Sequence, residues 1–297
     1  MNNPVIILPA PVRLELRHRV RRTLRQRLLR TLIGILLLAG AALICIPFFY
    51  MIASSLETNQ QIGQLTPQFI PSPIEWGNYQ QVWGLLPVGR FFFNSLLVAG
   101  AITVGQVLTA SLAAYAFARL RFRGRSLLFT VYLATLIIPF QVTLIPNYIL
   151  IRYLGWHDTY LGLIAPFLSS VFSTFLLRQF FLTIPVDLEE AALLDGAGHF
   201  TIYARIIMPL ARPALAALII FAFLGSWNNF LWPLVVVDSD SLKTLPLGII
   251  EFEGEFTIQW NLLMVGASLS LIPVLLVYLA AQRWIVQGIA LTGQGGR

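Results

Sequence analysis

The sequence predicts an all-α integral membrane protein in which six transmembrane helices leave both the N and C termini in the cytoplasm. Of its 297 residues, 57% are hydrophobic and 11% are charged, whereas soluble domains carry about 25% charged residues. Six apolar stretches reach the ~20 residues that a helix needs to cross a bilayer. Of the 20 lysines and arginines, all but Arg90, Arg152 and Lys243 flank these stretches on one side, and such a bias marks the cytoplasmic side.

The first 30 residues form a basic cytoplasmic segment. Eight arginines lie there with a single acidic residue, Glu15. Because an apolar span follows at once, the charge is interpreted as a topology signal rather than as a nucleic-acid-binding arm. That span, Thr31–Ser54, is longer than the apolar core of about 7–15 residues in a signal peptide, so it is predicted to stay uncleaved.

The other five spans complete a single transmembrane domain over residues 31–286, which a cytoplasmic tail follows at 287–297. Tryptophan and tyrosine in the loop at 55–90 are expected at the outer membrane interface. The five spans are predicted at Phe91–Phe117, Ser126–Leu150, Leu161–Phe181, Pro213–Val236 and Asn261–Val286.

The outer loop before the sixth span carries Glu251, Glu253 and Glu255. Acidic residues at this spacing are compatible with a cation site, but a solvated acidic loop is preferred. The chain has one cysteine, Cys45, and three histidines that are far apart in the sequence. No arrangement of nucleophile and base or of metal ligands stands out, so the chain is not expected to be an enzyme or to bind a metal.

The loop between the fourth and fifth spans, residues 182–212, is the most polar internal part of the chain, and we call it the elbow. Asp187 is predicted to cap a short helix, with Glu190 able to reach back to the cap N–H group. Gly196 is predicted to stop this helix, and a second helix is expected from His199 to Ile207, where Pro209 breaks it. The apolar residues expected to face a protein partner are Ala191, Leu194, Ile202 and Ile206.

The elbow carries the motif of a known family. Glu190-Ala191-Ala192, three residues, Gly196, nine residues and then Ile206-Ile207-Met208-Pro209 resembles the EAA loop of the membrane permease subunits of ABC importers, although Met208 stands where the family usually has leucine. The similarity extends over roughly residues 90–290. Phe93-Asn94-Ser95-Leu96, Trp227-Asn228-Asn229-Phe230 and Gln282-Arg283-Trp284 look like the sugar-uptake branch, in particular the second, shorter permease of maltose-type importers.

The resemblance implies a multi-pass permease in the inner membrane of a bacterial or archaeal cell. Its implied partners are a second permease subunit, an ABC ATPase dimer and an extracytoplasmic solute-binding protein that contacts the loop with Glu251, Glu253 and Glu255. ATP and Mg would be bound by the ATPase, since the only lysine, Lys243, follows Leu242 and forms no P-loop. The implied coupling residues are Glu190, Ala191, Ala192, Leu193, Asp195, Gly196, Ile206 and Pro209.

Two features depart from the family. Asn229 stands where the family often has aspartate, and the tail after residue 290 differs from the usual ending, so no tail contact with the ATPase is carried over. The role of Glu190 also remains open between a contact in the ATPase groove and capping of its own helix.

Polar residues within the spans are candidates for the solute path, or else they join helices to one another. The candidates are Gln141, Asn147, Trp227, Asn228 and Asn229. An aromatic ring beside amides suits a sugar, and no charged residue lies deep in a span, which argues against an ion-coupled carrier. The expected solute is a sugar, oligosaccharide or glycosylated small molecule. The alternatives are an importer of glycerol phosphate or a polyol, a stand-alone secondary carrier, and a non-transporting scaffold.

Overall fold

A computed structural model describes residues 10–64, 66, 68–252 and 258–294. These residues form helices joined by loops, with no β-strand among the described elements, which confirms the all-α class. The three longest helices are α1 (Ala10–Ser54), α4 (Val88–Arg119) and α15 (Trp260–Gln294). Within them, Gln26–Ser54, Val88–Arg119 and Trp260–Ala280 are long and apolar enough to cross a membrane. They coincide with the first, second and sixth predicted spans.

Three further spans are possible if each of three bent helix pairs crosses the membrane as one unit. The first pair joins α5 (Arg125–Ala134) and its 3-10 extension η1 (Thr135–Ile137) to α6 (Phe140–Tyr153), with a bend of 99°. Ile138 is extended there because a residue before proline disfavours the helical conformation, and Pro139 has no N–H group to donate. The predicted third span, Ser126–Leu150, therefore consists of two helices that meet at Ile138 and Pro139.

The fourth and fifth predicted spans are also interrupted. A 41° bend separates α7 (Tyr160–Ile164) and η2 (Ala165–Phe167) from α8 (Val171–Thr183). The third pair joins His199–Leu210 to α12 (Arg212–Trp227) with a bend of 80°. The stretch Pro213–Val236, predicted as one helix, ends with a separate helix, α13 (Leu231–Val236). The side-chain oxygen of Asn229 accepts the Trp232 N–H at 3.3 Å, so the amide that follows α12 starts a new helix instead of continuing the old one.

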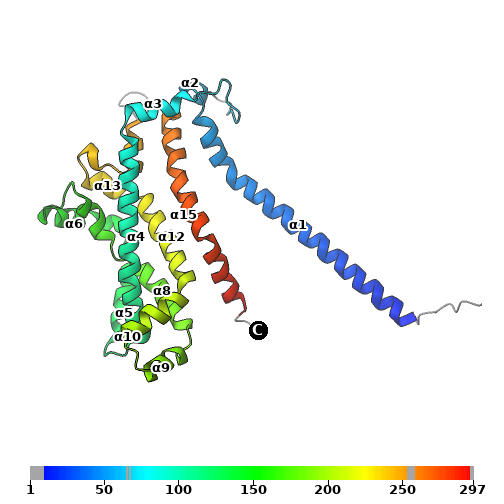
Figure 1. Ribbon diagram of the computed structural model, residues 1–297. Coiled ribbons are helices and arrows are strands. Elements are labelled where there is room, and N and C mark those ends of the chain that lie inside the picture. The colour runs from blue at the N-terminus through cyan, green and yellow to red at the C-terminus, as the bar shows by residue number, and fades with distance from the viewer. Residues whose placement is uncertain (1–9, 65, 67, 253–257, 295–297) are drawn as a thin grey trace, which may run out of the picture.

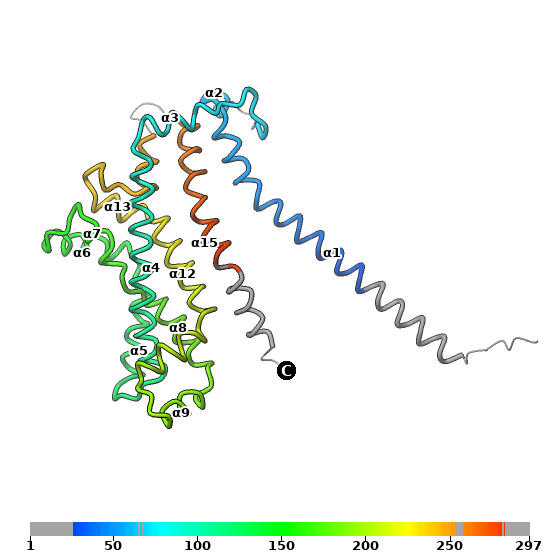
Figure 2. The backbone as a smooth tube through the Cα atoms, viewed as in Figure 1, coloured from blue at the N-terminus to red at the C-terminus, as the bar shows by residue number. Residues whose placement is uncertain are grey.

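The elbow lies at the end of the molecule opposite α2 (Asn59–Ile62) and α3 (Gly77–Leu85), as Figures 1 and 2 show. Helix α1 diverges from the other helices (Figure 1), and within its spanning stretch Gln26–Ser54 the buried residues are Ala53 and Ser54, at the end that reaches the other helices. The remaining elements are α9 (Asp187–Leu194), α10 (His199–Ile202), the π-helix η3 (Tyr203–Ile207), α11 (Met208–Leu210), η4 (Asp240–Leu242), α14 (Leu245–Ile249) and η5 (Ile250–Phe252).

The core forms where α4 packs against α8 and α12, and where α12 packs against α15. Ala110, Ala114 and Ala118 recur at four-residue spacing and are buried on one face of α4. Small residues at this spacing let helix backbones approach closely, which is how helices associate in a membrane. Their neighbours at the elbow end are Leu177, Phe181, Ile202 and Ile207. Helices α4, α8 and α12 therefore form one packed unit that runs from the elbow toward the opposite end of the molecule.

Candidate functional site

The first elbow helix, α9, ends as the sequence predicts. Gly196 adopts a left-handed conformation with φ of 81°. Its N–H donates to the Leu193 carbonyl at 3.0 Å, and the Ala197 N–H donates to the Ala192 carbonyl at 2.9 Å. This pair of bonds is a Schellman motif, which satisfies the last carbonyls of the helix and favours glycine because other residues are strained at this φ. Gly196 thus fixes the turn between the two elbow helices.

The start of α9 differs from the prediction. Val186 already has helical backbone angles and precedes the helix without a side-chain cap, while its carbonyl accepts the N–H groups of Glu189 and Glu190. Asp187 therefore lies inside the first turn, and the predicted capping box with Glu190 is wrong. The acidic residues of this turn still favour the helix, because they lie near the positive end of its dipole.

An ion pair joins α9 to the end of α4. Nε of Arg119 lies 2.9 Å from Oε1 of Glu189, and both side chains are almost completely buried. The Arg119 guanidinium also donates to the carbonyls of Phe181 and, at 2.6 Å, Ile184 at the end of α8. Burial raises the pKa of the Glu189 carboxyl, and the positive charges of Arg119 and His199 oppose that rise. One arginine therefore ties the elbow to two of the core helices.

The second half of the elbow is packed into the core rather than presented to a partner. Ile202 and Ile207 are fully buried, so the predicted availability of Ile202 to a partner is wrong, whereas Ile206 is half-buried against the same cluster. The Tyr203 hydroxyl lies 2.7 Å from Ser111 Oγ of α4. These contacts lock α10 and η3 onto α4.

Pro209 was predicted to end the second elbow helix, but the helix continues through it. It lies inside α11, and the 80° bend comes two residues later, between His199–Leu210 and Arg212–Trp227. The preceding turn is a π-helix, whose wider ring spares the contact between a proline ring and the carbonyl four residues earlier.

The exposed apolar surface of the elbow lies on and beside α9. Leu194 is 90% exposed and Phe200 is 74% exposed. Leu193 and Ala191 are also exposed, whereas Ala192 is half-buried against the core. The other coupling residues proposed from the resemblance, Glu190, Asp195 and Pro209, are all exposed.

A cavity of about 240 Å³ opens between the middle of α4, the start of α8 and the end of α12. The described residues that line it are all uncharged. Gln106 donates to the Phe167 carbonyl at 3.0 Å and accepts from Ser173 Oγ at 3.0 Å. Ser226 Oγ is buried here without a hydrogen-bond partner among the described residues. The cavity is lined by the polar residues Gln106, Ser170, Ser173, Ser226 and Asn229, the aromatic residues Phe167, Phe172 and Phe221, and Ile102, Ala222 and Gly225.

Of the five residues predicted for the solute path, Asn229 is the one that lines this cavity. Trp227 is buried and donates from Nε1 to Ser270 on α15, so it joins two helices. Asn228 is exposed after the end of α12, and Gln141 and Asn147 lie on α6. Sequence reasoning missed Gln106, Ser170, Ser173 and Ser226 as site residues, and their only signal was polarity within an apolar span.

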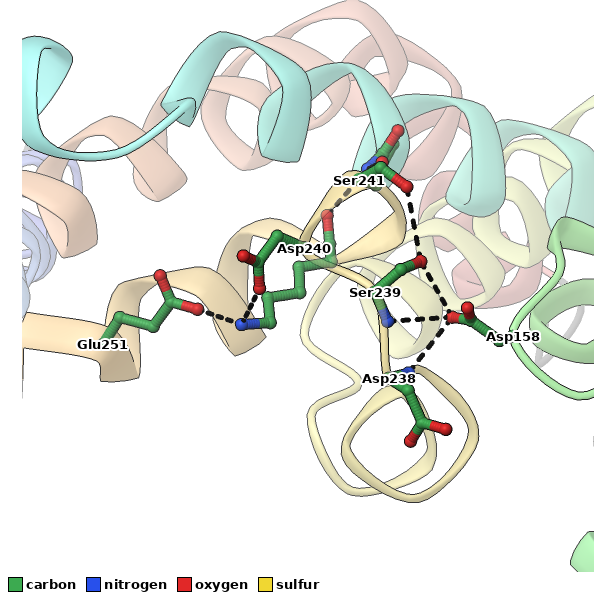
Figure 3. Close-up of polar contacts among 8 residues, drawn as sticks. Asp158, Asp238, Ser239, Asp240, Ser241 and Glu251 are labelled. Carbon is green, nitrogen blue, oxygen red and sulfur yellow. Dashed lines mark hydrogen bonds and ion pairs between the residues drawn. The ribbon is translucent and has the colours of Figure 1, made fainter.

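The loop around residue 240 is held by two polar groups (Figure 3). The Asp158 carboxylate accepts the N–H groups of Asp238 and Ser239, each at 3.1 Å, and these bonds lower its pKa. Lys243 pairs with Asp240 at 2.6 Å and also with Glu251, so both carboxylates share one positive charge within the chain. Glu253 and Glu255 lie outside the described residues. Within the described part of the chain, no group of three or more potential ligands could hold a metal ion.

The sequence matches the family described as "Binding-protein-dependent transport system inner membrane component" over residues 106–291. The sn-glycerol-3-phosphate transport system permease protein UgpE of Yersinia enterocolitica is 37% identical over 86% of this chain and 94% of its own length. UgpE of Brucella abortus is 36% identical over 91% of this chain and 99% of its own length.

Two solved structures share the fold. A bacterial ABC transporter involved in the import of the acidic polysaccharide alginate contains a chain with a TM-score of 0.76 at 23% identity, over 88% of this chain and 98% of that one. A bacterial alginate transporter in complex with an alginate pentasaccharide-bound periplasmic protein gives a TM-score of 0.59 at 14% identity, over 89% and 93%.

Proposed function

The chain belongs to the family of binding-protein-dependent transport system inner membrane components, and from that premise we propose that it carries a neutral sugar, oligosaccharide or glycosylated small solute across the membrane. In this proposal a second permease completes the path. A separate ABC ATPase dimer binds ATP and Mg, and a solute-binding protein delivers the solute at the outer face. The proposal includes six spans with both termini in the cytoplasm, an arrangement in which the elbow lies on the ATPase side.

The construction of the elbow is the observation that carries the proposal. Leu193, Leu194 and Phe200 expose apolar surface at one end of the molecule, while Arg119 and Glu189 fix the same segment to α4 and α8. A segment that is apolar outside and fixed inside is suited to receive the motion of a partner and to pass it to the core helices. Glu190, exposed and adjacent to Glu189, is assigned to a polar contact with the ATPase rather than to capping.

The neutral cavity supports the solute class. Ligand pockets are mostly apolar with a few polar groups that fix orientation, and this cavity combines serine, glutamine and asparagine side chains with three phenylalanines. The polar side chains suit the hydroxyl groups of a sugar, and the phenylalanine rings suit its C–H faces.

Import of glycerol phosphate is the second candidate, because the two curated relatives described above carry that name. A phosphate group would need cationic or multiple N–H donors along the path. In this candidate those donors belong to the paired permease.

The test is ATP hydrolysis by the complete assembly in proteoliposomes, with the binding protein and a panel of maltose, trehalose, glycerol and sn-glycerol 3-phosphate. Hydrolysis stimulated by one solute, together with uptake of that solute, is expected. Uptake driven by an ion gradient without any ATPase would show that the chain is a secondary carrier.

A further inference from the structure

We infer that the cavity between α4, α8 and α12 is a solute half-site that binds the hydroxyl groups of a neutral sugar and excludes a phosphate group. The inference rests on the proposed transport function and adds to it the residues and the chemistry of one site. Gln106, Ser173, Ser226 and Asn229 supply the polar groups, and Phe172 and Phe221 supply the apolar wall.

The polar groups of the cavity leave hydrogen-bonding capacity unused. Ser226 Oγ is buried without a partner among the described residues, and leaving a hydroxyl in this state costs about 1–3 kcal/mol. The Asn229 side-chain oxygen accepts the Trp232 N–H at 3.3 Å, which orients its amide group. A ligand hydroxyl can both donate and accept, so it can satisfy the serine and the amide together.

The polar side chains are also held in place. Gln106 bridges α4 to the Phe167 carbonyl and to Ser173 Oγ, both at 3.0 Å, and Ser173 is buried. The Ser170 side chain accepts the Ser173 N–H at the start of α8. Preorganised donors and acceptors lose little entropy when a ligand binds.

The charge of the cavity determines the ligand class. The described residues that line it are uncharged. A phosphate dianion moved there from water would lose its hydration without a compensating cation, which costs far more than the transfer of a hydroxyl group. The site therefore takes a polyhydroxylated neutral ligand.

Gly225 offers a direct way to fill the cavity. It lines the cavity, and a Cβ built on it meets nothing within 4 Å. Gly225→Leu should occupy the ligand volume without forcing the helices apart. Gly100, which lies on α4 outside the cavity lining and also has open space at Cβ, provides the matched Gly100→Leu control.

Uptake and ATP hydrolysis are measured together in proteoliposomes that contain the complete assembly, with maltose, trehalose and sn-glycerol 3-phosphate as probes. Gly225→Leu is expected to lower sugar uptake at least about tenfold, which corresponds to the loss of one or more ligand contacts. ATP hydrolysis stimulated by the loaded binding protein should persist in this variant, because the elbow is unchanged. A general folding defect would lower both rates.

Ser226→Ala is expected to lower sugar uptake about two- to tenfold, the effect of one hydrogen bond. Ser268→Ala is its control, because Ser268 Oγ is also buried with no hydrogen-bond partner in the part of the chain that the structure describes, but lies on α15 outside the cavity lining. Unchanged sugar uptake by Gly225→Leu, or faster uptake of sn-glycerol 3-phosphate than of either sugar by the wild type, would overturn the half-site and leave the importer function standing. Sugar uptake that needs no ATPase and is unchanged in Gly225→Leu would contradict both the half-site and the importer function.

Discussion

The elbow and the cavity are joined by the same helices but differ in their use of charge. Helix α8 starts at the cavity with Ser170 and Ser173 and ends at the elbow, where Arg119 holds its last carbonyls. Helix α12 runs the other way, from Arg212 beside the elbow to Ser226 at the cavity. At 1.5 Å per residue, α12 links the two regions over about 20 Å.

This difference separates two tasks. At the elbow, the buried Arg119 guanidinium fixes geometry, because it pairs with Glu189 and its charged hydrogen bonds to the carbonyls of Phe181 and Ile184 are strong. In the cavity, neutral groups allow a solute to bind and leave without a large cost of desolvation. The comparison predicts that substitutions at the elbow change stability and the coupling of ATP hydrolysis to uptake. Substitutions at the cavity should change solute uptake alone.

The largest effect is expected from Glu189→Ala. The change leaves the buried Arg119 guanidinium without its carboxylate, and removal of one partner of a buried ion pair costs roughly 3–5 kcal/mol. Since two carbonyls still accept from Arg119, we expect the lower end of that range. Thermal unfolding of the purified assembly in detergent measures it.

Glu190→Ala is the matched control, because Glu190 is the next residue and is exposed. It should change stability by less than about 0.5 kcal/mol, as surface substitutions do. Equal destabilisation by the two variants would contradict the assignment of separate roles to these neighbouring carboxylates.

Gly196→Asp is expected to have a moderate effect. A residue with a Cβ at this left-handed position costs roughly 1–2 kcal/mol, although no atom blocks the Cβ itself. The turn between the elbow helices should shift, so that ATP consumed per solute imported rises. Gly198→Ala serves as the control, because Gly198 has an ordinary negative φ and open space at Cβ. A Gly196→Asp assembly with the wild-type ratio of ATP to solute would show that the turn does not transmit motion.

The smallest effect is expected at the loop around residue 240. Asp158→Asn keeps a side-chain oxygen and tolerates the φ of 54° but loses the negative charge that accepts the Asp238 and Ser239 amides. The loss should be below about 1 kcal/mol, since this carboxylate is near solvent.

The pH dependence of the same contact follows from the lowered pKa of Asp158. The stabilisation is complete above the ordinary pKa of aspartate, about 3.9, and is lost as the pH falls through the lower folded-state value. In Asp158→Asn, amide hydrogen exchange at Asp238 and Ser239 should accelerate at neutral pH, because the charge that accepts both N–H groups is lost. Unchanged exchange would mean that the loop is held by other contacts.

The sequence predicted those features of the fold and the elbow that depend on local chemistry. Gly196 could be assigned to a helix end because only glycine suits the left-handed turn there. The all-α class and the EAA motif followed from hydropathy and spacing. Pro139 signalled a break in the third span, but the 99° direction of α6 depends on packing against other helices.

Long-range contacts could not be predicted in the same way. Arg119 and Glu189 lie 70 positions apart, and nothing in either local sequence selects Glu189 over Glu190 as the buried partner. Ile202 and Ile206 belong to an amphipathic stretch whose apolar side could face either a partner or the core. The cavity arises from three helices at once, so Asn229 could be proposed as a polar span residue while its neighbours Gln106 and Ser226 were overlooked.

In the proposed importer the exposed edge of α9 contacts the ATPase, and site-specific crosslinking from Leu194 would detect this contact. Cys45 is the only cysteine, so Cys45→Ser gives a background in which Leu194→Cys carries a single photoreactive group. Leu279→Cys, on an exposed face of α15, is the control. We predict that Leu194→Cys crosslinks to the ATPase in an active assembly and that Leu279→Cys does not. An active assembly that crosslinks only from position 279, or from neither position, would contradict the account.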